Sequence, residues 1–395
     1  MDYDVIVVGA GPIGSLAARY AAKNGAKTLL LEEHSMIGSP VSCTGHISTR
    51  ALAECELPDD GPYINKRIRG AFDHAPNNRF IEIDGRRTMT YVIERKTFDR
   101  EIAKIAVSAG ADILLNTSFK SMSRIDGGVS LDTISDGKKL SLTARVVIGA
   151  DGVKSKVARY SGLGRVPHIC SGIQVEAGYE PMDPEFVEIY SGSRYSPGYF
   201  AWSVPTSGDC CRIGLISDRD AHMYLNRLLN EHEIVSKKAR SAVDLIVGGI
   251  PVGTLKRTVS ESVMIVGDAA GHVKPVSYGG ICTGARCAKI AGEVAAKAVI
   301  EGNVRASRLM EYEKRWKSEL GNELAFGMAF RDVYRKMTDQ ELNDAVDMLD
   351  DTEILDIITK YGDIDSPSIL ARQLFRMTRN KKIWPIVKLF ARILI

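Results

Sequence analysis

The amino-terminal stretch constrains the fold more than any other part of this chain. An apolar run, Val5 to Val8, ends in Gly9-x-Gly11-x-x-Gly14, and small and apolar residues follow at helical spacing from Ser15 to Lys23. This order predicts a strand, a tight turn and a helix. Gly9 permits the turn, Gly11 lets backbone amides approach a pyrophosphate, and Gly14 lets the helix pack closely on the sheet.

A second apolar strand, from Lys27 to Leu31, is predicted next. It brings Glu32 or Glu33 to the distance at which a carboxylate accepts hydrogen bonds from an adenosine ribose. The alternative is a glycine-rich turn in an ordinary βαβ unit. The strand, glycines, helix, second strand and acid in this order favour a dinucleotide-binding unit.

Composition narrows the class of protein. With 395 residues and 45% apolar content, the chain can build a large core in two or three domains. The net charge of +3 gives no support for nucleic-acid binding. The seven cysteines are odd in number, and the chain opens directly into a strand without a basic leader, so we expect a reduced, cytoplasmic protein. No uncharged apolar run is long enough to span a bilayer, and no metal site is expected.

The order of strands and helices indicates interleaved domains of an α/β protein. Residues 60–92 alternate short apolar runs with turns, which is typical of antiparallel strands, and a predicted helix from Phe98 to Ala109 returns the chain to the first domain. We expect a nucleotide-binding domain of residues 1–60, 91–160 and 255–300. The antiparallel substrate-binding domain would comprise residues 61–90 and 161–254, and residues 301–395 a helical region.

Two later strings extend the first motif. Asp151-Gly152 follows an apolar strand, and Gly267-Asp268 follows another. Together with the amino-terminal glycines they resemble the three signatures of the flavoprotein monooxygenase superfamily, whose members share a glutathione-reductase-like Rossmann FAD domain. The resemblance implies noncovalent FAD, with Asp268 on the ribityl chain and Asp151 supporting the fold near the pyrophosphate.

The residues around Asp268 agree with this interpretation. A short carboxylate at the end of a strand can accept hydrogen bonds from sugar-like hydroxyls. Gly279 and Gly280 precede a helix predicted from Ala285 to Ile300, whose first amides could approach the pyrimidine edge of a flavin. A glycine-capped structural helix is the alternative. Arg95 is expected to reach the phosphate or ribityl region, or else to solvate the surface.

A run of aromatic residues between prolines, from Tyr195 to Pro205, narrows the family. It resembles the geranylgeranyl reductase branch, whose pattern is Pro-x-x-Tyr-x-Trp-x-Phe-Pro. Pro197, Trp202 and Pro205 match that pattern, while Phe200 stands at the Tyr position and Val204 at the Phe position. Cys43, in Pro-Val-x-Cys, is a second shared feature, although this chain has His46 where the branch tends to have glycine.

The resemblance implies hydride transfer from reduced FAD to isoprenoid double bonds of archaeal ether-lipid precursors. Cys43, Phe200 and Trp202 are expected to shape the reactive pocket. Motifs and resemblance together assign the cofactor contacts to Gly9, Gly11, Pro12, Ile13, Gly14, Glu32, Glu33, Cys43, Thr44, Gly45, His46, Arg95, Phe119, Asp151, Gly267, Asp268, Gly279, Gly280 and Ile281. The expected substrate contacts are Pro197, Tyr199, Phe200, Trp202 and Pro205.

Reduction of an isolated alkene needs a site that delivers a proton or tolerates positive charge on the tertiary carbon. The faces of Trp202, Phe200 or Tyr199 could supply about 1 to 2 kcal/mol through the ring quadrupole. Alternatively, Trp202 and Phe200 fill the core of the sheet. Two rival functions stay open: a group-A aromatic hydroxylase that uses NAD(P)H and O2, and a non-catalytic flavin-binding protein. The electron donor could be a ferredoxin, another reduced carrier or NAD(P)H.

The carboxyl-terminal segment is basic and amphipathic. From Ser366 onward the chain has no acidic residue, and residues 383–395 can place apolar side chains on one helical face with Lys388 and Arg392 opposite. Such a helix suits the headgroup region of an anionic membrane, with Trp384 at the boundary, and implies a peripheral location on the inner face of the cell membrane. A docked core helix is the alternative.

Overall fold

In the computed structural model, which describes residues 1–376, the amino-terminal strand β1 (Tyr3–Val8) lies inside an eight-stranded sheet. It pairs in parallel with its two neighbours, and Val5 to Val8 are buried because both faces of this sheet are covered. The main strand order is β17 (Val259–Ser260), β18 (Val263–Ile265), β11 (Lys138–Gly149), β1, β2 (Thr28–Leu31) and β8 (Asp112–Leu114). The remaining strands, β9 (Thr117–Ile125) and β10 (Gly128–Ser135), form a hairpin that pairs with β11.

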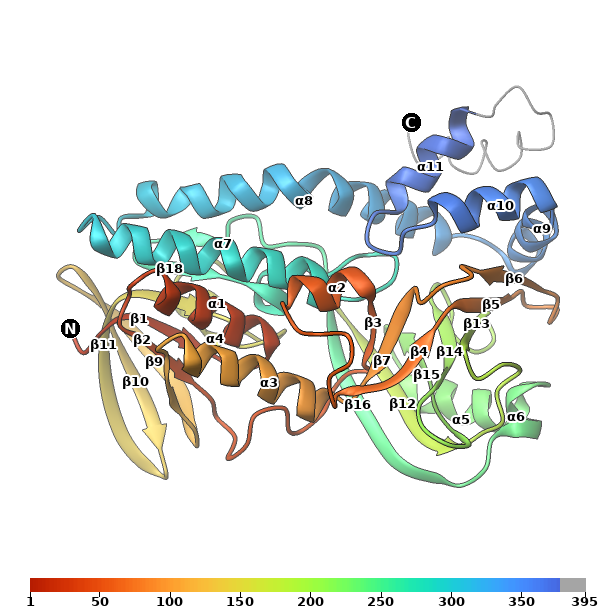
Figure 1. Ribbon diagram of the computed structural model, residues 1–395, viewed down its shortest axis with the longest axis horizontal. Coiled ribbons are helices and arrows are strands. Elements are labelled where there is room, and N and C mark those ends of the chain that lie inside the picture. Colours follow the sequence, from red (N-terminus) through yellow and green to blue (C-terminus); the bar gives the residue numbers. More distant parts are fainter. Residues whose placement is uncertain (377–395) are drawn as a thin grey trace.

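Helices cover one face of this sheet in two layers (Figure 1). The inner layer contains α1 (Pro12–Lys23), α3 (Arg95–Ser108) and α7 (Ile281–Ile300), and α8 (Ala306–Tyr334) packs outside α7. α7 begins four residues before the predicted start at Ala285, because the chain enters the helix directly from Gly280. The short helix α4 (Lys156–Tyr160) packs against β9.

The second sheet is mainly antiparallel and holds seven strands. Their order is β16 (Ala242–Val252), β12 (His168–Gly178), β15 (Cys210–Ser217), β14 (Phe200–Pro205), β13 (Phe186–Ser191), β5 (Gly70–His74) and β6 (Phe80–Asp84). Helices α5 (Ala221–Glu231) and α6 (Val235–Lys238) pack on one face. Because side chains alternate along a strand, Ala201 packs on that face while Phe200, Trp202 and Val204 belong to an apolar cluster on the other.

A small third sheet joins the two halves. It contains β3 (His46–Ser48), β7 (Thr90–Ile93) and β4 (Ile64–Ile68), and β3 leads into α2 (Thr49–Glu54). The predicted boundaries at residues 60 and 90 divided these strands between two domains. In the structure β7 hydrogen-bonds to both β3 and β4, so this small sheet crosses the predicted boundaries.

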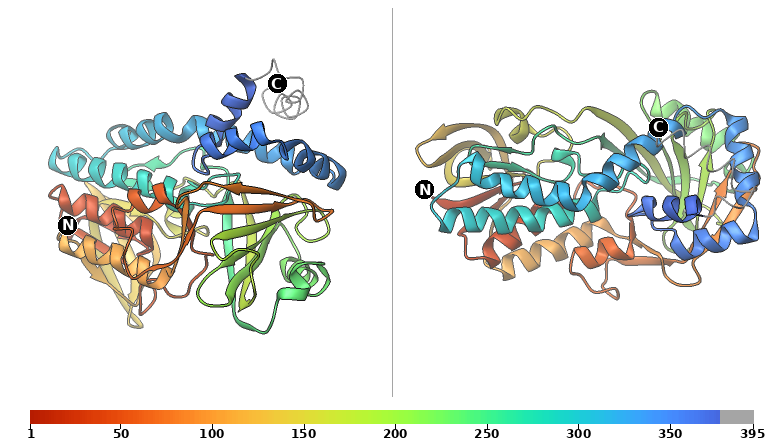
Figure 2. Two further views of the ribbon diagram at one scale, coloured as in Figure 1. Left: turned by 45° about the vertical axis from the view of Figure 1, so that its right-hand side comes forward. Right: turned by 90° about the horizontal axis from the view of Figure 1, so that it is seen from above.

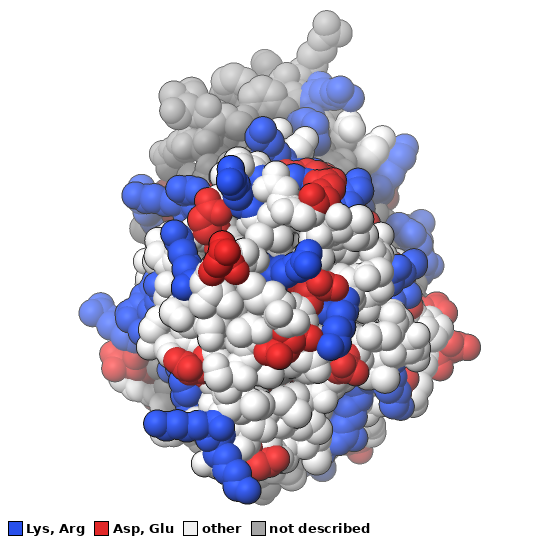
Figure 3. All heavy atoms as spheres, turned by 90° about the vertical axis from the view of Figure 1, so that its left-hand side faces the viewer, with Lys and Arg blue, Asp and Glu red and all other residues white. Residues whose placement is uncertain are grey.

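The carboxyl-terminal helices lie over the second sheet and turn back toward α8. α9 (Asp339–Leu349), α10 (Thr352–Tyr361) and α11 (Pro367–Arg376) continue from the end of α8 above the second sheet (Figures 1 and 2). The predicted basic helix, residues 383–395, lies outside the described residues. At the end of the molecule formed by the first sheet, basic and acidic side chains are interspersed (Figure 3).

Candidate active site

A cavity of about 700 Å³ extends from the first sheet to the second. One end lies against the N-termini of α1 and α7, and the other lies against β13, β14 and the segment from α10 to α11. The predicted site residues that line it are Gly11, Pro12, Ile13, Gly14, Cys43, Thr44, His46, Arg95, Phe200, Trp202, Gly267, Asp268, Gly279, Gly280 and Ile281.

The glycine turn before α1 has the geometry that its sequence predicts. Gly9 has a φ of 100°, and a Cβ on Gly14 would lie 1.8 Å from the Gly9 carbonyl oxygen. A Cβ on Gly11 would meet no protein atom within 4 Å. No side chain caps α1 at Gly11, so its first amides are available at the cavity. Such an array of amides at a helix N-terminus suits a phosphate group.

Of the two candidate acids after β2, the structure brings Glu32 to the glycine turn. Its Oε2 accepts a hydrogen bond from the Ala10 amide at 3.0 Å, and its Oε1 accepts one from the His34 amide at 3.0 Å. Glu33 is exposed, and neither of the two acids lines the cavity. Glu32 is therefore the acid that lies against the glycine turn before α1.

Asp268 lies in the short 3₁₀ helix η1 (Gly267–Ala270) and faces the cavity. Its carboxylate accepts no hydrogen bond from another residue in the described part of the chain. Burial raises its pKa, and the charge of Arg95 opposes that rise. A Cβ on Gly280 would lie 2.9 Å from Asp268 Oδ1, so glycine is needed where α7 begins beside this carboxylate.

Arg95, at the start of α3, is held by a bidentate ion pair. Its Nε and Nη2 each donate to an oxygen of Asp99 at 2.9 Å, and both side chains are largely buried. The pKa of Arg95 is raised despite burial because Asp99 lies beside it. The guanidinium therefore stays protonated at the cavity lining, with its charge balanced by Asp99.

The loop that contains Cys43 is fixed by the second sheet. Arg212 Nη1 donates to the Thr44 carbonyl at 2.6 Å, and Thr44 Oγ1 donates to Gln174 Oε1 at 2.7 Å. The Gly45 amide contacts Cys43 Sγ at 3.3 Å. These contacts fix the loop whose Cys43 lines the cavity.

His46 lies at the end of the same loop. Its Nε2 is 2.7 Å from Thr90 Oγ1, and burial lowers its pKa to about 4. The imidazole is therefore neutral near pH 7.

The far end of the cavity has an aromatic and aliphatic wall. Phe200 and Trp202 form an edge-to-face pair with centroids 6.1 Å apart, and Trp202 Nε1 donates to Gln174 Oε1 at 3.2 Å. Further apolar lining comes from Ile68, Ala71, Ile83, Val187, Ile189, Val204, Ile216, Ile246, Ile250, Ile358 and Leu370.

Several predicted residues lie elsewhere. Tyr199 is 1% exposed and does not line the cavity, and its hydroxyl donates to Asp218. Pro197 and Pro205 are outside the lining as well, because they precede and end the six residues of β14. Phe119 packs against Tyr160 in the core around β9, away from the cavity.

Three of the predicted cofactor contacts have a structural role in this protein, namely Asp151, Gly9 and Gly45. The Asp151 carboxylate accepts hydrogen bonds from Ser155 Oγ and from the amides of Lys156 and Val157, so it fixes the start of α4. Gly9 and Gly45 have positive φ angles and shape turns next to the cavity.

Two cavity residues escaped the sequence interpretation. Gln174 is 2% exposed and links Trp202 to Thr44, and Tyr278 has a φ of 57° in the loop before α7. Two sequence signals could have found them. Gln174 is a polar residue between apolar residues of β12, and Tyr278 directly precedes two glycines.

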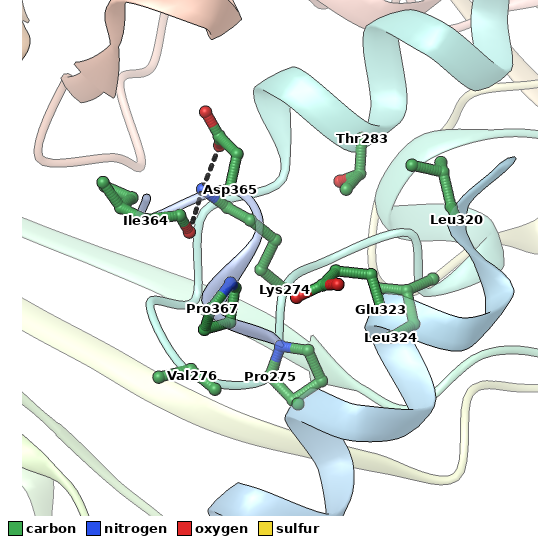
Figure 4. Close-up of a pocket in the computed structure, with 11 residues that line it drawn as sticks. Lys274, Pro275, Val276, Thr283, Leu320, Glu323, Leu324, Ile364, Asp365 and Pro367 are labelled. Carbon is green, nitrogen blue, oxygen red and sulfur yellow. Dashed lines mark hydrogen bonds and ion pairs between the residues drawn. The ribbon is translucent and has the colours of Figure 1, made fainter. Parts of the chain in front are cut away.

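The loop before α7 is also tied to the carboxyl-terminal segment. Lys274 Nζ lies 2.5 Å from Asp365 Oδ1 and 3.2 Å from the Ile364 carbonyl oxygen, beside a small pocket of about 20 Å³ (Figure 4). This buried ion pair connects the segment after α10 to the loop that leads into α7.

Within residues 1–376, no helix has both the length and the apolar character needed to cross a bilayer. Histidine, cysteine and acidic side chains in this described part form no cluster suited to a metal ion.

Comparisons with known proteins agree with this geometry. The family model described as FAD binding domain matches residues 2–208. An uncharacterized protein of Methanocaldococcus jannaschii is 33% identical over 379 residues, which is 95% of each chain. Digeranylgeranylglycerophospholipid reductase 1 of Methanothermobacter thermautotrophicus is 35% identical over 91% of this chain and 93% of its own length. The crystal structure of a geranylgeranyl bacteriochlorophyll reductase-like protein from Thermoplasma acidophilum has a TM-score of 0.84 and 27% identity, with coverage of 95% and 98%.

The glycine turn, the open helix N-termini and the unpartnered Asp268 fit FAD, and with the matched family model they define a flavin-dependent oxidoreductase. Within that class, the chain belongs to the family of the digeranylgeranylglycerophospholipid reductases. The expected fold class and the expected cofactor are thereby confirmed.

Proposed function

We propose that this protein saturates isoprenoid double bonds of archaeal-type ether phospholipids with hydride from reduced FAD. The observation that carries the proposal is the single cavity that joins an anion-binding end to an apolar end. Its apolar lining suits a prenyl chain, because a chain without polar groups can leave the bilayer only for an equally apolar site.

The residues at the first end would hold the cofactor. The amides at the start of α1 suit the pyrophosphate, Glu32 the ribose and Asp268 the ribityl hydroxyls. The open N-terminus of α7 suits the pyrimidine edge, where the helix dipole favours negative charge on reduced flavin. FAD bound here and reduced by the electron donor would supply the hydride.

Phe200 and Trp202 would act on the alkene. Their rings can stabilise positive charge that develops on the tertiary carbon, by about 1 to 2 kcal/mol each when water is excluded. Cys43, which also lines the cavity, would help to shape the pocket.

The rival function, aromatic hydroxylation with NAD(P)H and O2, needs polar groups that orient a phenol. The second-sheet wall of this cavity is predominantly aliphatic and aromatic, which favours the reductase. Oxygen-dependent product formation would favour the rival.

An anaerobic experiment tests the proposal. The FAD-loaded protein is reduced with dithionite and mixed with a geranylgeranyl ether phospholipid, and we expect flavin reoxidation with two hydrogen atoms gained per bond by mass spectrometry. The fully saturated lipid with the same headgroup is the control. Absence of reoxidation by the unsaturated lipid would refute the proposal.

We further infer that the protein contacts the membrane peripherally through its basic carboxyl-terminal segment. The amphipathic pattern of residues 383–395 supports this inference. Deletion of these residues should reduce binding to anionic liposomes, and unchanged binding would refute it. Stopped-flow reduction of bound FAD by a ferredoxin, another reduced carrier or NAD(P)H would identify the electron donor.

A further inference from the structure

Tyr278 has an unusual backbone conformation. Its φ of 57° lies in the left-handed region, although Gly279 and Gly280 follow directly and could adopt such a conformation freely. Its amide donates to the Lys274 carbonyl at 2.9 Å, so the loop closes on itself. A bulky residue held in this region is a feature that clusters at functional sites.

The strained backbone places the Tyr278 side chain at the cavity. Its ring centroid is 6.0 Å from that of Phe200 on the aromatic wall and 5.6 Å from that of Tyr199. The same loop continues through Gly279 and Gly280 into the N-terminus of α7. Tyr278 is therefore a phenol between the flavin end and the apolar end.

A buried arginine contacts Tyr199, the tyrosine that packs against Tyr278. Arg331, on α8, is 6% exposed, and its Nη2 donates to the Tyr199 hydroxyl at 3.1 Å. Its Nε has no hydrogen-bond partner among the described residues. Burial raises the pKa of Tyr278 to about 12, and the positive charge of Arg331 opposes the rise. The phenol is thus protonated near pH 7, and the charge of Arg331 favours its phenolate form.

We propose that Tyr278 donates the proton that accompanies hydride transfer, with Arg331 as its positioning residue. This inference rests on the proposed function. The O–H bond of Tyr278 breaks as a C–H bond forms at the less substituted carbon, and the hydride forms the second C–H bond at the tertiary carbon. The alkene gains two electrons and two hydrogen atoms, FAD is left oxidised, and the phenolate recovers its proton from water.

Single-turnover kinetics test the role of the phenol. Tyr278→Phe should slow reoxidation of reduced FAD by the lipid about 100-fold, the range of general acid catalysis, while FAD affinity stays within twofold. Tyr334→Phe is the matched control, because Tyr334 is a tyrosine of α8 outside the cavity lining whose hydroxyl contacts Ser191 at 2.9 Å. A Tyr278→Phe rate within twofold of wild type would overturn the proposal.

A binding experiment tests the same hydroxyl without turnover. A lipid with an epoxide in place of each double bond offers an acceptor oxygen, so oxidised wild-type protein should bind it about fivefold more tightly than the saturated lipid, which one hydrogen bond supplies. Tyr278→Phe should lose this preference. Equal preference in both proteins would overturn the proposal, and it would do so even if the wild type reduced no lipid.

Arg331 is tested by a pair of variants. Arg331→Met should slow reoxidation at least tenfold, and Arg331→Lys should restore part of the rate because it keeps a positive charge near the phenol. A purely structural role predicts that the two variants lose rate in proportion to their loss of thermal stability, and that result would contradict the positioning role.

Discussion

The two ends of the cavity are built in different ways. At the flavin end, contacts come from backbone amides and glycines of short contiguous motifs, as in the turn from Gly9 to Gly14. At the substrate end, they come from side chains of strands far apart in sequence, and Gln174 of β12 joins Trp202 of β14 to Thr44 of the cysteine loop.

This difference has a physical cause. A phosphate or a ribityl chain is recognised by polar groups in fixed positions, so few sequences build the site. A prenyl chain is recognised by shape and apolar area, which many combinations of side chains supply. We therefore expect substitutions at the flavin end to act on folding or FAD affinity, and those at the substrate end to act on lipid reduction.

The largest effect is expected at Gly14. A methyl group there would lie 1.8 Å from the Gly9 carbonyl oxygen, so Gly14→Ala must move α1 away from the sheet and should lower the free energy of unfolding by about 3 kcal/mol. Gly11→Ala is the control, because its methyl group meets no protein atom and should only weaken FAD binding. Chemical denaturation and FAD titration of both variants measure the two effects, and equal stability of the two would contradict the packing role of Gly14.

Asp268→Asn should separate cofactor binding from stability. The variant loses charge-assisted hydrogen bonds to the ribityl chain, so FAD affinity should fall by about 1.5 to 3 kcal/mol. Burial raises the pKa of Asp268, which means that its ionised form destabilises the FAD-free protein near pH 7, and the amide should raise the Tm of that protein.

Asp151→Ala is the contrasting variant for Asp268→Asn. Its carboxylate caps α4, so its loss should lower the Tm of the FAD-free protein. Thermal denaturation without FAD measures both, and a lower Tm for Asp268→Asn would contradict the assignment of Asp268 to the cofactor.

The difference between the two ends of the cavity also explains which parts of the site the sequence could predict. The Gly9 to Gly14 motif, Asp268 and the glycines before α7 were identified because each is local and each needs a particular backbone geometry. The family pattern pointed to Phe200 and Trp202, which line the cavity, but Tyr199, which was also expected at the substrate, packs in the same apolar cluster without lining the cavity. Gln174 and Arg331 could not be assigned, because only the paired strands and the packing of α8 bring them to the site.

Trp202→Ala should leave FAD bound and reduce the rate of alkene reduction about tenfold, because it removes an aromatic face and widens the cavity. Gln174→Leu should have a smaller effect on the rate, since it leaves Trp202 Nε1 and Thr44 Oγ1 without their shared partner. Anaerobic reoxidation by the lipid and FAD titration measure both properties. Loss of FAD from Trp202→Ala would break the division between the two ends.

The smallest expected effect is on the pH dependence of folding stability, through His272 in the core. His272 is fully buried against Trp316, its two nitrogens lack hydrogen-bond partners within the described residues, and burial lowers its pKa to about 3. The unfolded chain therefore binds a proton at His272 below about pH 6.5, whereas the folded protein does not, so stability is lost as pH falls from about 6.5. His46, with a pKa lowered to about 4, contributes in the same direction.

Thermal denaturation between pH 7 and pH 5 tests this linkage. The Tm of wild type should fall by a few degrees over this range, and His272→Phe should reduce the fall because it removes one group that takes up a proton on unfolding. His222→Ala, at an exposed position of α5, should leave the slope unchanged. If His272→Phe and wild type have equal slopes, His272 is charged or solvated in the folded protein, and the packing of the core around Trp316 is looser than this structure indicates.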